Sequence, residues 1–184
     1  YDLFDIFMEK PEPLAPRFLR LEVTERLDPE GNVLTPLDEN EAKRNIEKLA
    51  NMDVEAIAIT LLHSFLNPVH EKKMEDLLRE QVPKIMTSLS SEVTPEIREY
   101  HRSSTTLANA YVRPLMQKYL DQLSQRIRQE GVNRDLYIML SNGGIGTIET
   151  AKNFPIRLVE SGPAAGAMAA AYYGKHLNIH NLIS

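Results

Sequence analysis

The sequence predicts an α/β fold in which parallel strands alternate with helices and two glycine-bearing turns follow. Residues 54–62 form a near-continuous apolar run, which is typical of a strand buried on both faces of a parallel sheet. A helical pattern at 68–81 separates this run from a second strand-like run at 85–91. The strand–helix–strand order predicts right-handed βαβ connections in a layered α/β architecture. Six of the eight glycines fall between residues 136 and 174.

The composition is that of an ordinary globular protein and excludes several function classes. Hydrophobic residues make up 42% of the 184-residue chain and charged residues 26%, with a net charge of −5. This acidic balance argues against a broad nucleic-acid-binding face. With no cysteine, the chain has no disulfide or thiolate metal site, as fits a reducing cytosol. No apolar run reaches membrane-spanning length. We therefore expect a cytoplasmic protein that binds neither nucleic acid nor membrane.

The N-terminal residues read as a lead-in followed by a β-hairpin. Residues 1–17 are linker-like, with three prolines between 9 and 17. Apolar and polar residues then alternate over 18–27, which indicates a half-exposed strand. A turn at 28–31 and a short return strand complete a predicted hairpin at 18–34.

Helix signals follow in regular order. Asp38 is placed as an N-cap with Glu41 three residues later, and Ala42 and Ile46 start the apolar stripe of that helix. Asn67 is a predicted N-cap with Pro68 at the first helical position. A short helix is expected to start at 94–96.

The longest helical pattern covers residues 103–130 and completes an α/β region at 18–135. Apolar residues recur every four positions and predict a buried stripe, comprising Leu107, Tyr111, Leu115, Tyr119, Leu123 and Ile127. Pro114 is expected to kink this helix or to separate two helices. Gly131 is a suitable residue for ending it.

The C-terminal region, residues 136–184, carries the glycine-rich segment. A predicted strand at 136–140 ends in Ser141, Asn142, Gly143 and Gly144. A second predicted strand, at 156–159, ends in the run Ser161, Gly162, Pro163, Ala164, Ala165 and Gly166. Ligands of open α/β sheets bind beyond the carboxyl ends of strands. A Ser-Gly-Pro start also leaves helix N–H groups free for an anion. The alternative is structural, since small residues at 164–171 would let this helix pack closely on another.

Known catalytic and metal motifs are absent. No GxxxxGK[ST] loop, complete GxGxxG fingerprint or GxSxG elbow occurs. His63, at the end of a predicted buried strand, is the one catalytic candidate, and a structural histidine that bonds a loop carbonyl is the alternative. His176 and His180 have helical i, i+4 spacing but no third ligand, so we predict no metal site.

Four segments together resemble the hydantoinase A/5-oxoprolinase family, whose members include ATP-dependent N-methylhydantoinases and carboxylase subunits. The segments are LLHSFLNPVHE at 61–71, LSSEVTPEIREYHRSSTTLANAYVRPLM at 89–116, MLSNGG at 139–144 and VESGPAAG at 159–166. The resemblance implies an actin-like ATPase fold of the ribonuclease H-like, sugar-kinase and heat-shock class, of which this chain is a lobe fragment. It also implies ATP and Mg²⁺ bound between two lobes, with phosphorylation of an amide or enol oxygen.

The resemblance also assigns residues and marks a departure. Ser161, Gly162, Pro163 and Gly166 resemble the connecting segment beside the nucleotide, and Ser141, Asn142, Gly143 and Gly144 resemble a cleft-lining turn. His63 and residues 99–106 would border the substrate side. The family's Asp-x-Gly-Gly-Thr phosphate hairpins do not occur here. We therefore expect a central fragment, inactive alone, with residues 174–184 leading toward such a hairpin.

The resemblance implies part of an ATP-dependent cyclic-amide hydrolase that opens hydantoin or 5-oxoproline rings. One alternative is a subunit of an ATP-dependent acetone- or acetophenone-type carboxylase. The other is a non-catalytic module for subunit assembly. The resemblance further implies a hydantoinase B-type partner and an oligomeric parent protein.

Overall fold

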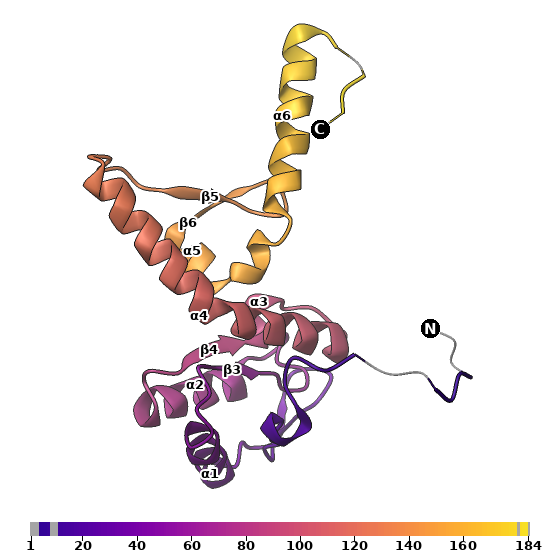
Figure 1. The fold of residues 1–184 in the computed structure, drawn as a ribbon. Coiled ribbons are helices and arrows are strands. Elements are labelled where there is room, and N and C mark those ends of the chain that lie inside the picture. The colour runs from indigo at the N-terminus through magenta and orange to yellow at the C-terminus, as the bar shows by residue number, and fades with distance from the viewer. Residues whose placement is uncertain (1–3, 8–10, 180, 184) are drawn as a thin grey trace.

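Two parallel strands, β3 (Ala56–Ile59) and β4 (Met86–Leu89), form the centre of the N-terminal part in the computed structural model, which describes residues 4–7, 11–179 and 181–183 (Figure 1). Their register pairs Ala56 with Met86 and Ile59 with Leu89. Helices α1 (Glu39–Ala50) and α2 (Val69–Gln81) lie on one side of the strands, and α4 (Glu99–Gln129) lies on the other. The predicted βαβ unit is therefore present, with α2 connecting the two strands.

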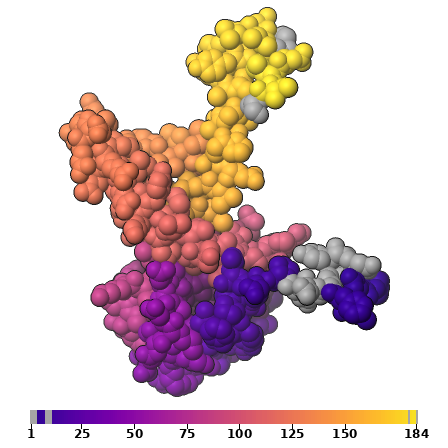
Figure 2. All heavy atoms as spheres, in the orientation of Figure 1, coloured from indigo at the N-terminus to yellow at the C-terminus, as the bar shows by residue number. Residues whose placement is uncertain are grey.

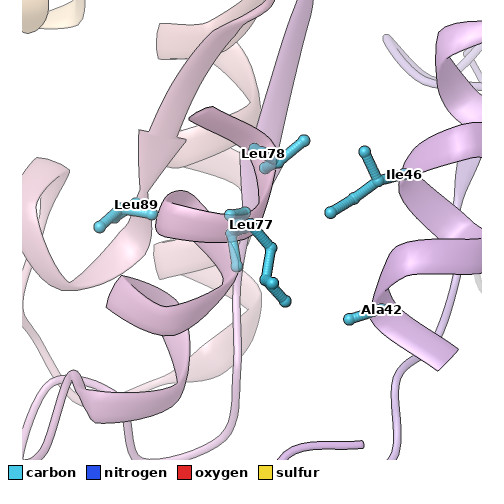
Figure 3. Packing of buried hydrophobic residues seen from close by; sticks show 6 residues of the cluster. Ala42, Ile46, Leu77, Leu78 and Leu89 are labelled. Carbon is cyan, nitrogen blue, oxygen red and sulfur yellow. The ribbon is translucent and has the colours of Figure 1, made fainter. Parts of the chain in front are cut away.

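The hydrophobic core lies between these helices and strands. Ile46 of α1 points toward Leu77 and Leu78 of α2, and Leu89 of β4 lies behind them (Figure 3). Ile46, Leu78 and Leu89 are each 1% exposed. Burying a side chain of this size contributes roughly 1.5–3 kcal/mol, so this cluster is the main apolar stabilisation of the N-terminal part.

Side chains at the predicted caps define the helix starts. Asp38 Oδ1 accepts hydrogen bonds from the N–H groups of Asn40 and Glu41, at 3.0 and 2.9 Å. Glu41 does not reach back to Asp38, because its Oε2 accepts from the N–H of Thr24 at 2.7 Å. The Asn67 side chain accepts from the N–H of Val69, where α2 begins, one residue after the predicted Pro68.

The hairpin is shorter than the alternation predicts. Strand β1 (Arg26–Leu27) pairs antiparallel with β2 (Val33–Thr35), whereas Arg17–Leu19 forms the 3-10 helix η1. Residues 20–25 lie outside any ladder, so the strand predicted over 18–27 is wrong for most of its length. Bonds to α1 hold this segment, since the Asn45 amide donates to the carbonyl of Glu22 at 2.7 Å.

Helix α3 (Ser90–Val93) directly follows β4, so the strand predicted to run to residue 91 ends two residues earlier. The short helix expected at 94–96 is wrong, because those residues are not helical. Helix α4 begins four residues before the predicted start and continues through Pro114 as one helix. Gly131, at φ +88°, donates to the carbonyl of Arg128, and Val132 donates to Ile127, which ends the helix as predicted.

The buried side chains of α4 are mostly polar, contrary to the predicted apolar stripe. Tyr111, Leu115 and Tyr119 are 66%, 71% and 54% exposed. The buried positions of this helix are instead Arg102, Thr106, Asn109, Ala110 and Leu120. Helix α4 packs over β3 and β4 with side chains that carry hydrogen-bonding groups.

The C-terminal part contains a hairpin and three helical segments. Strands β5 (Tyr137–Met139) and β6 (Ile145–Thr147) pair antiparallel, and helix α5 (Ile148–Asn153) follows. The strand predicted at 156–159 is wrong, because Pro155 opens the 3-10 helix η2 (Pro155–Leu158). Helix α6 (Ser161–Leu177) then projects away from the N-terminal part (Figures 1 and 2). Among the described residues, no helix combines the length and apolar character needed to cross a membrane.

Candidate functional site

The first predicted site segment forms the tight turn that joins β5 to β6. Leu140 donates its N–H to the carbonyl of Gly144 at 2.8 Å, and Gly143 donates to Leu140 at 3.0 Å. The Asn142 side chain accepts from the N–H of Gly144 at 2.9 Å. Gly143 has φ +82°, a backbone conformation that residues other than glycine rarely adopt. The sequence Ser141 to Gly144 therefore specifies this turn.

The second predicted segment is the start of α6. Ser161, Gly162 and Pro163 occupy its first turn, and Gly166 lies one turn further on. Glu160 precedes them in the left-handed conformation, at φ 61°, and its side chain does not cap the helix. Since the first N–H groups of a helix have no intrahelical acceptor, this uncapped start can donate to an anion. A side-chain atom added at Gly162 would meet nothing within 4 Å, so the helix start is open.

The structure brings these two segments together. A Cβ atom at Gly143 would lie 2.7 Å from Sδ of Met168, so the turn packs closely against α6. The carbonyl of Arg157, in η2, accepts from the N–H and Oγ of Ser141 at 2.8 and 2.9 Å. The turn and α6 are thus packed together. The turn follows strand β5, as predicted, but the start of α6 follows the 3-10 helix η2 and not a second strand.

A cluster of buried polar side chains lies at the carboxyl ends of β3 and β4. Glu71 of α2 is fully buried and accepts three hydrogen bonds. Its Oε1 accepts from the N–H of Leu61 at 3.0 Å and from Oγ of Ser90 at 2.6 Å, and its Oε2 accepts from the N–H of Ser91 at 2.9 Å. Oγ of Ser64 lies 3.1 Å from that of Ser90. Glu71 therefore joins the two strand ends.

Arg102 completes this cluster from α4. It is 1% exposed, donates to the carbonyl of Leu61 at 2.6 Å and lies 5.3 Å from the ring of Phe65. Glu71 and Arg102 thus bind the N–H and the carbonyl of the same residue, which places two opposite buried charges on either side of it. Nε of Arg102 and Oγ of Ser91 are buried without a hydrogen-bond partner in the described structure.

His63 lies beside this cluster, in the loop after β3. Its φ is 59°, its carbonyl accepts from Leu66 and Asn67, and its ring lies 6.2 Å from that of Phe65. Within the described part of the chain, no hydrogen bond joins His63 to the turn at 141–144 or to the start of α6. The catalytic candidate and the predicted cofactor residues are therefore two separate groups.

Two side chains missed by the sequence analysis connect α4 with the segment before α6. The Asn109 amide donates to Oγ of Ser88 and to the carbonyl of Asn153, both at 3.0 Å, and its Oδ1 accepts from the N–H of Ile156 at 3.2 Å. Arg113 donates to the carbonyl of Thr87 and to Oδ1 of Asn153. Burial lowers the pKa of the Arg113 guanidinium below its usual range. Arg102, Asn109 and Arg113 are seven and four residues apart, a spacing that places them on one face of a helix, and this spacing was the clue in the sequence to the polar face.

A further hollow in the described structure lies at neither group. It is a groove of about 880 Å³ bordered by the C-terminal half of α4, β5 and α5. Lys152 lies in it and pairs with Asp121 at 2.7 Å and Glu149 at 2.9 Å. The hydrogen bond to Asp121 and then that to Glu149 raise the pKa of Lys152. The charge of Lys152 is thus paired within the chain, and the groove contains none of the predicted site residues.

The described residues form no closed cluster of metal-ligating side chains. Mg²⁺ is held by carboxylate oxygens and waters. Among the described residues, no three His, Cys, Asp or Glu side chains are grouped so as to hold a metal ion.

Comparison with known proteins identifies the family. The hydantoinase/oxoprolinase N-terminal region matches residues 1–82, and the hydantoinase/oxoprolinase model matches residues 102–184. An uncharacterized protein of Methanocaldococcus jannaschii is 43% identical over 98% of this chain and 27% of its own length.

Two solved structures share the fold. The crystal structure of an ATP-dependent caprolactamase from Pseudomonas jessenii has a TM-score of 0.88 and 30% identity, over 98% of this chain and 26% of that one. A nucleotide-free acetone carboxylase structure has a TM-score of 0.82 and 33% identity, over 92% and 24%. The chain spans about a quarter of each relative. These matches confirm the actin-like ATPase fold, and the chain belongs to the hydantoinase/oxoprolinase family.

Proposed function

We propose that this chain forms part of a cytoplasmic, ATP-dependent enzyme that opens cyclic amides such as hydantoins or 5-oxoproline. The observation that carries the proposal is the contact between the turn at 141–144 and α6, whose start is uncapped. This unit offers backbone N–H groups and the positive end of a helix dipole to phosphate oxygens. The family membership and the similarity to an enzyme described as an ATP-dependent caprolactamase support a nucleotide as the anion.

The residues of this chain would bind and orient rather than react. The backbone N–H groups of Asn142, Ser161 and Gly162, which have no acceptor among the described residues, would contact the nucleotide. Gly166, which has no side chain, would leave room for the nucleotide beside α6. Phosphorylation of the amide oxygen would turn a poor leaving group into a good one, so that ATP hydrolysis drives ring opening. Positioning and charge stabilisation are the main tasks of a protein in phosphoryl transfer.

The buried cluster around Glu71 and Arg102 would border the substrate side. It lies at the carboxyl ends of two parallel strands, where α/β sheets place their ligands. His63 and residues 99–106 belong to this side, and the positive φ of His63 is a strain of the kind found at functional sites. A catalytic role for His63 remains part of this proposal.

A carboxylase is the second candidate, because the acetone carboxylase structure matches this chain with 33% identity. In that case the phosphorylated atom would be an enol oxygen and bicarbonate the second substrate. A partner subunit of the hydantoinase B type fits both candidates, since the aromatic and aliphatic residues on α4 leave an exposed apolar face. A role in assembly alone would need no nucleotide.

One assay on the full-length protein separates these functions. Phosphate release from MgATP is measured with 5-oxoproline, hydantoin or caprolactam, and in parallel with acetone or acetophenone plus bicarbonate. We expect cyclic amides to stimulate release. Stimulation by ketone and bicarbonate alone would favour the carboxylase, and no ATP turnover with any substrate would leave the assembly role. The isolated 184-residue chain is expected to be inactive. MgATP turnover by it would contradict the expectation that part of the nucleotide site lies outside these residues.

A further inference from the structure

Arg157 contacts both regions described above, and neither sequence motif includes it. From η2, its Nη2 donates to the carbonyls of Glu92 at 3.2 Å and Val93 at 3.4 Å, both in α3. The guanidinium lies over the ring of Phe154, 4.4 Å from the centroid, which fixes its direction. Its side chain therefore attaches η2 to the helix that directly follows β4.

The main chain of the same residue attaches η2 to the glycine turn. The carbonyl of Arg157 accepts both the N–H and the Oγ of Ser141, at 2.8 and 2.9 Å. A carbonyl that accepts two donors from one residue restrains both its backbone and its side chain. The turn at 141–144 is thereby held at its first residue, next to the close contact of Gly143 with Met168.

The two attachments make a short path between the ends of β4 and the turn. Ser90 and Ser91, at the start of α3, bind Glu71, which also binds Leu61 after β3. The carbonyls of α3 bind the Arg157 side chain, and the Arg157 carbonyl binds Ser141. The hydrogen bonds of this path are all 3.4 Å or shorter, and the backbone of α3 links Ser90 and Ser91 to Glu92 and Val93.

The other contacts of η2 do not replace this path. Asn109 binds Asn153 and Ile156, which holds the segment against α4 but contacts neither α3 nor the turn. Removing the guanidinium would therefore leave η2 attached to α4 while its carbonyl lost the α3 anchor. The expected consequence is local: the turn moves, and the fold stays.

We propose that Arg157 is a positioning residue that fixes the nucleotide-facing turn relative to the carboxyl ends of β3 and β4. This inference rests on the proposed function for the nature of the ligand, but the mechanical connection does not. Arg157 acts through Ser141 and contacts no reacting atom.

The connection is tested by hydrogen exchange in the full-length protein, without nucleotide. In Arg157→Gln, amides of residues 141–144 should exchange on the order of tenfold faster, because the bond from Ser141 opens more often. Arg157→Lys keeps one donor and should show a smaller increase. Arg79→Gln removes an arginine with only exposed ion pairs to Glu75 and Asp76, and should change nothing at the turn. Unchanged exchange in folded Arg157→Gln, or in Arg157→Lys if the former does not fold, would overturn the proposal.

Steady-state kinetics of ATP hydrolysis give the second readout. Arg157→Gln should raise the KM for ATP on the order of tenfold while lowering kcat less, with partial recovery in Arg157→Lys. A wild-type protein that does not hydrolyse ATP would refute the proposed function, and the exchange data would still decide whether Arg157 holds the turn. An active wild type with unchanged KM in Arg157→Gln would refute the positioning role alone.

Discussion

The N-terminal and C-terminal parts of this chain are held together by different interactions. The core cluster is drawn entirely from residues 42–89. After residue 135, the buried residues within the described chain are Ala151, Pro155 and Gly174, whereas Tyr137, Ile145 and Tyr172 are about 60% exposed or more. Polar bonds from Asn109, Arg113 and Arg157 attach this part to the rest. Apolar burial therefore stabilises the fold, and hydrogen bonds position the candidate cofactor segment.

The largest expected effect comes from the core. Leu78→Ala should lower the free energy of unfolding by about 2–5 kcal/mol, since it leaves a cavity between α1 and α2. The matched control is Leu115→Ala on the exposed face of α4, with an expected change within about 0.5 kcal/mol. Urea unfolding of each variant measures the difference. Equal losses at both positions would show that the apolar face of α4 is covered in solution.

Removing a buried charge should have the next largest effect. Glu71→Gln keeps the shape but turns an amide N–H₂ toward groups that donate to the carboxylate, so we expect a loss of about 2 kcal/mol. Asp76→Asn, on the exposed side of the same helix, is the control and should change little. A similar free energy of unfolding for both variants would mean that Glu71 does not join the strand ends.

Two glycines with positive φ separate the effect of a contact at the candidate site from the effect of backbone strain. Gly143→Ala and Gly131→Ala both force alanine into positive φ, at +82° and +88°, and should each cost about 1–2 kcal/mol. Only at Gly143 does the new Cβ meet Met168, whereas at Gly131 nothing lies within 4 Å. Titration with ATP should therefore show weaker binding, by on the order of tenfold, for Gly143→Ala alone.

Adding Met168→Ala removes the clash and should restore part of the lost affinity. Equal ATP affinity in Gly143→Ala and Gly131→Ala would instead show that the turn at 141–144 does not contribute to nucleotide binding.

The smallest effect concerns the exposed hairpin. The side-chain hydrogen bond from Asn32 is the main cause of the lowered pKa of Asp28, with further backbone bonds from Asn32, Glu30 and Gly31. A lowered folded pKa stabilises the hairpin above pH 3.8, and this contribution is lost as the pH falls through the folded value. Asn32→Ala should raise the pKa of Asp28 toward 3.8 in an NMR titration. Asn51→Ala, at the end of α1, should leave it unchanged.

The sequence predicts best where local chemistry decides the structure. Asp38 caps α1, Gly131 ends α4, and the two apolar runs pair in parallel, because each depends on a few neighbouring residues or on a strongly buried strand. The turn at 141–144 also follows from its own Asn and Gly residues. The proximity of this turn to α6 depends on tertiary contacts through Arg157 and Met168, which the spacing of residues along the sequence does not reveal.

The wrong predictions for α4 and for residues 156–159 have separate physical causes. Apolar periodicity shows that a face favours burial, but not which segment covers it. The middle of the stripe on α4, at Tyr111, Leu115 and Tyr119, is therefore exposed here. The opposite face is buried because Arg102, Asn109 and Arg113 supply donors for carbonyl groups at strand ends and loops. At 156–159, a short apolar run fits a strand or a helix equally well, and Pro155 decides for a 3-10 helix.

Hydrogen exchange of the full-length protein with a non-hydrolysable ATP analogue tests the central claim most directly. The account predicts that the analogue protects the amides of the turn at 141–144 and those of Ser161 and Gly162 at the start of α6, with little change at 42–50 in the N-terminal core. Binding of the analogue without protection at either segment would contradict it.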